Sequence, residues 1–173
     1  MLVTLTPHPD TPFAAIDRIE VDVGRREEFI WLRFAVYGDV GRVRWPEAAD
    51  PDRADDLWRQ TCFEVFVPTD DGYREFNLSP SGAWASYRFD GYRTGMAPAD
   101  ERAQVLGLEA TETWATLEAL IEPPPGGVCI GLSAVIEEID GGISYWALAH
   151  PPGKPDFHHP DSFALILPPP EPA

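Results

Sequence analysis

The stretch CFEVFVPTDDGYREFNLSPSGAWASYRF, residues 62–89, decides the fold because it holds three strand-like segments joined by two turn signals. Polar and apolar side chains alternate along Cys62–Val67 and Tyr73–Asn77, the period of two expected when the two faces of a strand differ. Thr69-Asp70-Asp71-Gly72 and Pro80-Ser81-Gly82-Ala83 supply residues that tolerate positive φ or preset a turn. The stretch therefore predicts three antiparallel strands in succession.

The first turn fixes a register between the first two segments. Pairing them around the four-residue turn, so that Pro68 faces Tyr73, places Glu64 opposite Asn77. Side chains that alternate along each strand then fall on two different faces, one apolar and one that carries the polar residues. The hairpin is thus predicted to have one core face and one polar face.

The second turn extends this face to a third strand. If Ser79 faces Trp84, then Glu75 faces Arg88 across the second strand pair. The predicted register gathers a polar strip on one face of the sheet, which consists of Glu64, Glu75, Asn77, Trp84, Ser86 and Arg88.

Three interpretations of this strip are open. It is an ordinary solvated face if the sheet packs on one side only. It is a sugar-binding face if its carboxylates, amide and arginine bind hydroxyls while the tryptophan ring stacks on a pyranose. Glu64 and Glu75 also suggest a glycosidase pair, but an arginine facing Glu75 would strengthen its acidity and remove the proton donor. No catalytic residue is therefore predicted.

The rest of the chain repeats the strand pattern at intervals of about ten residues, with almost no helical periodicity. The predicted class is all-β, an antiparallel β-sandwich of about ten strands, in one domain that spans residues 1–173 with a frayed proline-rich tail at about 168–173. The expected strands are Ile16–Val23, Glu28–Tyr37, Gln60–Val67, Tyr73–Ser79, Trp84–Phe89, Gln104–Glu109, Glu112–Ile121, Val128–Ile139, Ile143–Ala149 and Phe163–Leu167.

Composition limits the partners. The net charge of −16 would repel a nucleic-acid backbone or an anionic membrane, so neither is predicted as a partner. The first residues lack the basic start and apolar run of a secretory signal, which predicts a cytoplasmic protein. Cys62 and Cys129 are then expected to be reduced.

A second motif is HPPGKPDFHHP, residues 150–160, where four prolines should hold an extended crossing between two strands. His150, Asp156 and His158 are candidates for a divalent metal site, because histidine and carboxylate side chains suit zinc and similar ions. They are weak candidates, because their spacing matches no standard zinc pattern. In a second interpretation of this segment, Lys154 and His158 lie at the mouth of the polar strip and bind a ligand there. The segment is equally compatible with a purely structural crossing, in which Asp156 and His158 satisfy backbone groups.

The segments DLWRQTCFEVFVP and YREFNLSPSGAWASYRFDGYRTGM resemble the DOMON-like group of β-sandwich domains, close to the family 9 carbohydrate-binding modules. The "CxEVF" pattern and a turn similar to "NPSG", here Asn77–Gly82, carry the likeness. The C-terminal segment YWALAHPPGKPDFHHPDSFAL resembles the end of a bacterial DOMON-like subfamily of unassigned function. The resemblance implies an immunoglobulin-like or jelly-roll sandwich that binds a sugar or haem b, and it does not imply catalysis.

The sequence and the resemblance together predict a non-catalytic domain that binds a carbohydrate or a related small polar ligand. One alternative is a haem-binding electron-transfer domain, in which Met96 and either His150 or His158 hold the haem iron. Another is a protein-interaction module that uses an edge strand or an aromatic face. The predicted ligand-binding residues are those of the polar strip together with Lys154 and His158.

Overall fold

We describe residues 1–11, 15–26, 28–126 and 129–170 of a computed structural model. They form strands and three short 3₁₀ helices, and every pair of named strands is antiparallel. The strands are β1 (Leu2–Pro7), β2 (Ile16–Arg25), β3 (Ile30–Gly38), β4 (Cys62–Thr69), β5 (Gly72–Leu78), β6 (Trp84–Phe89), β7 (Ala97–Pro98), β8 (Ala103–Ala110), β9 (Trp114–Ile121), β10 (Cys129–Glu137), β11 (Ile143–Ala147) and β12 (Leu165–Ile166). The helices are η1 (Val40–Arg42), η2 (Leu57–Arg59) and η3 (Pro160–Ser162).

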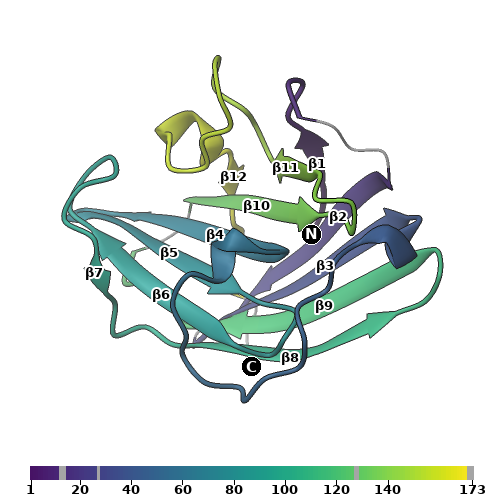
Figure 1. Cartoon of the computed structure of the whole chain (residues 1–173). Coiled ribbons are helices and arrows are strands. Elements are labelled where there is room, and N and C mark those ends of the chain that lie inside the picture. Colours follow the sequence, from purple (N-terminus) through teal and green to yellow (C-terminus); the bar gives the residue numbers. More distant parts are fainter. Residues whose placement is uncertain (12–14, 27, 127–128, 171–173) are drawn as a thin grey trace.

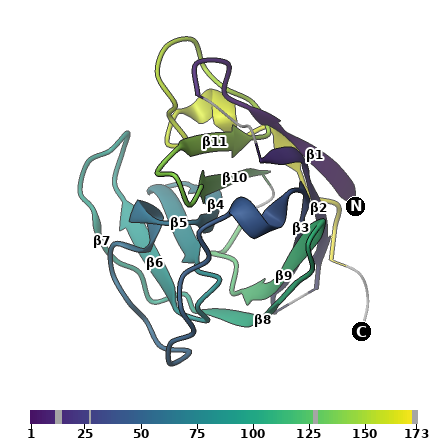
Figure 2. The same ribbon diagram turned by 45° about the vertical axis from the view of Figure 1, so that its right-hand side comes forward.

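The strands follow one hydrogen-bonded path, in the order β7-β6-β5-β4-β10-β11-β1-β2-β3-β9-β8, and β12 pairs with β10. This sheet curls into a half-barrel: β5 and β6 lie at the left of Figure 1 and β8 and β9 at its lower right, and Figure 2 shows the two pairs on opposite sides of the interior. β1 joins the two halves, because it pairs along β2 and also, through Thr6 and Pro7, with the end of β11.

The main core fills the space inside the curl. Phe34 of β3 and Phe63 of β4 come from opposite halves of the sheet, and their ring centroids are 4.8 Å apart. Trp146 of β11 is 1% exposed and belongs to the same core. Burial of such large apolar side chains is the dominant favourable term in folding, so this contact between the halves stabilises the curl.

The all-β, antiparallel prediction is confirmed, and each of the ten expected strands has a counterpart. β1 and β7 were not predicted, and Val128, expected to begin a strand, lies outside the described residues. The sandwich of two separate sheets is not confirmed, because β1 makes the path continuous. Cys62 and Cys129 are both free thiols, as expected.

The register of the first hairpin is confirmed: Glu64 pairs with Asn77 and Pro68 with Tyr73. The predicted register of the second pair is wrong by one residue, since Leu78 rather than Ser79 faces Trp84.

A shorter turn explains the slip of the second pair. The N–H of Ser79 donates to the carbonyl of Ala83, and Gly82 takes a φ of +100° that lets the chain close one residue earlier. A slip of one residue moves every side chain of β6 to the opposite face.

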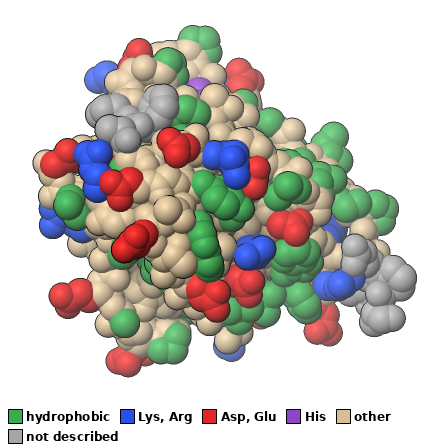
Figure 3. All heavy atoms as spheres, turned by 90° about the vertical axis from the view of Figure 1, so that its right-hand side faces the viewer, with side chains coloured by type: hydrophobic (Ala, Val, Ile, Leu, Met, Phe, Trp, Pro, Cys, Tyr) green, Lys and Arg blue, Asp and Glu red, His purple; other side chains and the backbone are tan. Residues whose placement is uncertain are grey.

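The surface seen in Figure 3 carries acidic and basic side chains interspersed among apolar ones. Among the described residues, no helix is long and apolar enough to cross a membrane.

Candidate functional site

The outer face of the β4-β5-β6 half carries a second cluster of buried aromatic side chains. Phe66, Tyr73, Tyr87 and Phe89 alternate with the core-facing residues of these three strands. The segment between β11 and β12, residues 148–164, folds over this face and brings Phe157 into the cluster (Figure 1). The face that the hairpin pattern predicted as polar is therefore partly covered and mostly buried.

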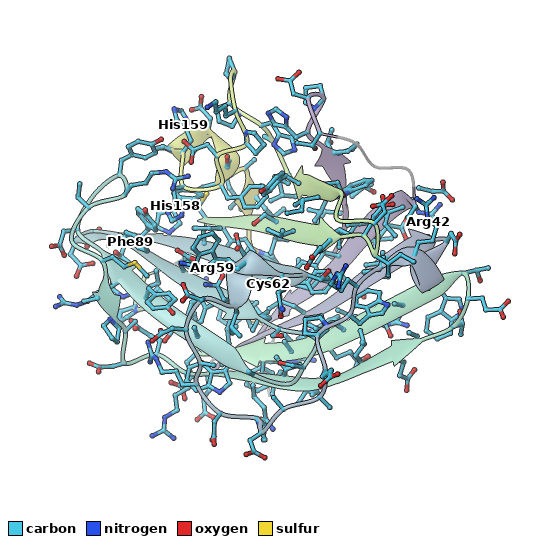
Figure 4. All side chains as sticks on the ribbon, in the orientation of Figure 1. Arg42, Arg59, Cys62, Phe89, His158 and His159 are labelled. Carbon is cyan, nitrogen blue, oxygen red and sulfur yellow. The ribbon has the colours of Figure 1, made fainter. Side chains whose placement is uncertain are left out.

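A pocket of about 660 Å³ lies between this face and the covering segment. Its volume is within the range of about 300 to 1,000 Å³ that is common for small-molecule sites. Strands supply the floor, and η2, the β6–β7 loop and the covering segment supply the walls. The lining residues are Trp58, Arg59, Glu64, Glu75, Phe89, Arg93, Met96, Val135, Ile143, Tyr145, Pro155, Phe157 and His158. In Figure 4 the labelled Arg59, Phe89 and His158 mark this part of the molecule.

Two buried carboxyls form the polar part of the floor. Glu64 on β4 and Glu75 on β5 are 3% and 5% exposed and occupy diagonal positions of the strand pair. The Ser133 hydroxyl donates to Glu64 Oε2 at 3.3 Å, and Asn77 Nδ2 donates to Glu75 Oε1 at 2.9 Å. The Oδ1 atom of Asn77 is buried and has no hydrogen-bond partner among the described residues.

Burial makes both carboxyls weak acids. Desolvation raises the pKa of Glu75 to about 7, against the opposing effects of the Asn77 hydrogen bond and of Arg93. Desolvation, and then the charge of Glu75, raise the pKa of Glu64 well above its usual range. The expectation that Arg88 strengthens the acidity of Glu75 is therefore wrong, because Tyr87 rather than Arg88 faces Glu75. Such a pair can hold a proton near neutral pH.

His158 links the covering segment to the floor. Its Nδ1 lies 2.7 Å from the Tyr73 hydroxyl, and its Nε2 lies 3.7 Å from Glu75 Oε2. Burial lowers the pKa of His158 to about 4, and the positive charge of Arg93 acts in the same direction. The ring is consequently neutral near pH 7 and orients toward Glu75 without a charge of its own.

Asp156 fixes the covering segment to the β6–β7 loop. Its carboxylate accepts from Arg93 Nη2 at 2.7 Å, from the Tyr92 hydroxyl and from the backbone N–H of His158. These bonds lower the pKa of Asp156 despite its partial burial. The structural interpretation of Asp156 is confirmed, whereas the side chain of His158 lines the pocket.

The predicted site residues divide into two groups. Glu64, Glu75 and His158 line the pocket, and Asn77 is buried beside them. The other predicted residues lie elsewhere.

The shorter turn accounts for the three residues of β6. Arg88 is exposed on the opposite face, Ser86 donates to the carbonyl of Glu101, and Trp84 packs against the main core. Lys154 is exposed and is not among the residues that line the pocket.

Most of the walls were missed because they come from distant parts of the chain. Trp58 and Arg59 lie on η2, at the end of the long acidic loop that precedes β4. Phe89 and Phe157 are separated by more than sixty residues and meet only through the fold. Trp58 belongs to the segment DLWRQTCFEVFVP, which carries part of the resemblance to DOMON-like domains. This resemblance was the one sequence signal that could have indicated Trp58 as a site residue.

Among the described residues, no three or more His, Cys, Asp or Glu side chains are grouped to hold a metal ion. The Nε2 atom of His150 lies 2.8 Å from the carbonyl oxygen of Thr6, and Asp156 pairs with Arg93. The three weak metal candidates therefore do not form one site.

The axial ligands expected for haem do not fit either. Met96 and His158 line the same pocket, but both ring nitrogens of His158 face other protein groups. His150 contacts Thr6 and is not among the residues that line the pocket. His158 is thus held by other protein groups, and His150, whose Nδ1 has no hydrogen-bond partner among the described residues, does not line the pocket that contains Met96.

Comparison of the chain with protein-family models, curated proteins and solved structures finds no match. The likeness to DOMON-like domains consequently stays a prediction.

Proposed function

We propose that the protein is a binding domain for a small polar ligand, a carbohydrate or a compound of similar hydroxyl content, and that the ligand occupies the pocket under residues 148–164. The observation that carries the proposal is the composition of this pocket. Its floor offers the carboxyls of Glu64 and Glu75, and its lining also includes the rings of Trp58, Tyr145 and Phe157. Carboxyl groups bind sugar hydroxyls, and aromatic rings pack on the apolar faces of a pyranose.

The architecture is compatible with this function. A rigid scaffold of strands holds the floor, while loops supply the walls, an arrangement that is common in binding domains. A DOMON-like sandwich remains our proposal for the family, supported by the packing of Phe34 on Phe63 between the two halves of the sheet. The ligand class does not depend on this family assignment, because it rests on the lining residues.

Calorimetric titration against a panel of neutral and amino mono- and oligosaccharides tests the proposal. Trp58 is 47% exposed, so Trp58→Ala removes a wall of the pocket at little cost to the fold. We expect this variant to weaken binding of a panel member at least fivefold. The matched control is Arg88→Ala, whose side chain lies on the opposite face and whose loss should leave affinity unchanged. A panel without any binder, or equal losses in both variants, would overturn the proposal.

A further inference from the structure

The floor of the pocket carries two carboxyls, and the nearby charge of Arg93 lowers their pKa values less than burial raises them. Among the described residues, no lysine or arginine forms an ion pair with Glu64 or Glu75 within 4.0 Å. The two arginines of the walls are engaged elsewhere, Arg59 with Asp56 at 3.2 Å and Arg93 with Asp156 at 2.7 Å. The Nε2 atom of His158 lies 3.7 Å from Glu75 Oε2.

Buried carboxylates without a counter-charge are costly, so they either hold a proton or meet a cation. A neutral sugar supplies hydroxyls that donate to them but leaves the charge uncompensated. A ligand ammonium group supplies both the donors and the opposite charge. The pocket is therefore better matched to a cation than to a neutral polyol.

The hydrogen-bonding groups of the floor point to the same chemistry. Glu64 and Glu75 provide the carboxyl oxygens of the lining, whereas Asn77 is fully buried beside them and is not a lining residue. The amide donor of Asn77 is already used on Glu75. An ammonium group has three N–H donors and no acceptor, which complements a site that is rich in acceptors.

The aromatic rings that line the pocket are also suited to a positive charge. Phe89, Tyr145, Phe157 and Trp58 contribute aromatic rings to the same pocket. The face of an aromatic ring attracts a cation that lies within about 6 Å, most strongly when water is excluded. The net charge of −16 adds a general attraction for cationic ligands.

We propose that the pocket selects ligands that bear a protonated amine, such as an amino sugar or another small hydroxylated amine, and that Glu64 and Glu75 bind the ammonium group. This inference rests on the proposed function, because it specifies the ligand class of the same pocket. It differs from a general sugar site in one measurable respect, the preference for an amine over the hydroxyl that replaces it.

Matched probe pairs test this preference. Glucosamine and 6-amino-6-deoxyglucose are titrated against glucose, and cyclohexylamine against cyclohexanol, each by calorimetry with the wild-type protein. We expect at least one amine to bind tenfold or more tightly than its hydroxyl partner. In Glu64→Gln and Glu75→Gln, which keep the shape of the side chain but remove the charge, the ratio should fall to within about threefold. Glu112→Gln, an exposed position in the turn before β9, is the matched control and should keep the full preference.

The outcomes separate this inference from the proposed function. Neutral sugars that bind as tightly as the amines would overturn the amine preference and leave the sugar site standing. An amine preference that survives in both glutamine variants would show that these carboxyls do not bind the ammonium group, and would also overturn the inference. Absence of binding by every saccharide and amine would overturn the proposed function, and this inference with it.

Discussion

Replacement of Glu75 by glutamine should stabilise the protein at alkaline pH. The carboxyl is 5% exposed, and desolvation raises its pKa from the usual 4.5 to about 7 in the folded state. A group with a higher pKa in the folded state contributes its full stability below the unfolded pKa and loses it as the pH rises through the folded pKa. The loss for Glu75 therefore occurs between about pH 4.5 and pH 7 in the wild-type protein.

The magnitude follows from the two pKa values. A rise from 4.5 to about 7, at about 1.4 kcal/mol for each pKa unit, amounts to roughly 3 kcal/mol. Glutamine resembles the protonated acid and can still accept from Asn77 Nδ2 through its side-chain oxygen. The variant has no carboxyl to ionise at this position, so it does not lose stability as the pH rises. Its free energy of unfolding relative to the wild type should therefore rise by roughly 3 kcal/mol between pH 4 and pH 8.

Urea unfolding at pH 4 and pH 8 measures this difference. The free energies of unfolding of wild-type, Glu75→Gln and Glu112→Gln proteins are compared at both pH values. Glu112→Gln changes the same functional group at an exposed position and should show a difference of less than about 0.5 kcal/mol. If Glu75→Gln were equally stable relative to the wild type at both pH values, Glu75 would not be a desolvated acid, and the account of the pocket floor would be refuted.

Three further predictions concern the groups around the floor. The ring of His158 should titrate by NMR with a midpoint near pH 4. Its contribution to the free energy of unfolding is therefore present above about pH 6.5 and is lost as the pH falls through 4. A midpoint near 6.5 would contradict the burial of this ring. Tyr73→Phe removes the hydroxyl that contacts His158 and should cost about 1 kcal/mol in urea unfolding, whereas no loss would show that the contact is not made in solution. Gly72→Ala should cost at least about 2 kcal/mol, because the added methyl carbon would lie 1.9 Å from the carbonyl oxygen of Phe89 at a φ of +134°. Gly126→Ala is also at positive φ but meets no described atom within 4 Å, so it should cost less, and equal costs would exclude the clash as the cause.

The first hairpin could be predicted from sequence because two independent local signals agree. Alternation along β4 and β5 defines their faces, and the turn at Thr69–Gly72 defines which residues meet. At the second turn the local signal was insufficient, since Pro80, Ser81 and Gly82 permit more than one loop length. The positive φ of Gly82 shortens the loop by one residue and sends Arg88 to the other face.

The character of the site depended on contacts that local patterns do not contain. Glu64 and Glu75 were correctly placed on one face, but that face becomes buried because Phe157 and His158 cover it from far along the chain. Burial then reverses the expected acidity of Glu75. Sequence reasoning thus located the pair, whereas its chemistry follows from long-range packing.

The titration of the Glu75 carboxyl itself tests the central claim most directly. Carbon-detected NMR of the glutamate side chains, with the signal assigned through Glu75→Gln, follows protonation in the free protein and in the presence of the tightest amine probe. The account predicts a midpoint near 7 that falls when the amine binds, because a neighbouring positive charge favours the carboxylate. A midpoint near 4.5 that does not respond to any probe would contradict a desolvated, ligand-binding carboxyl on the floor of this pocket.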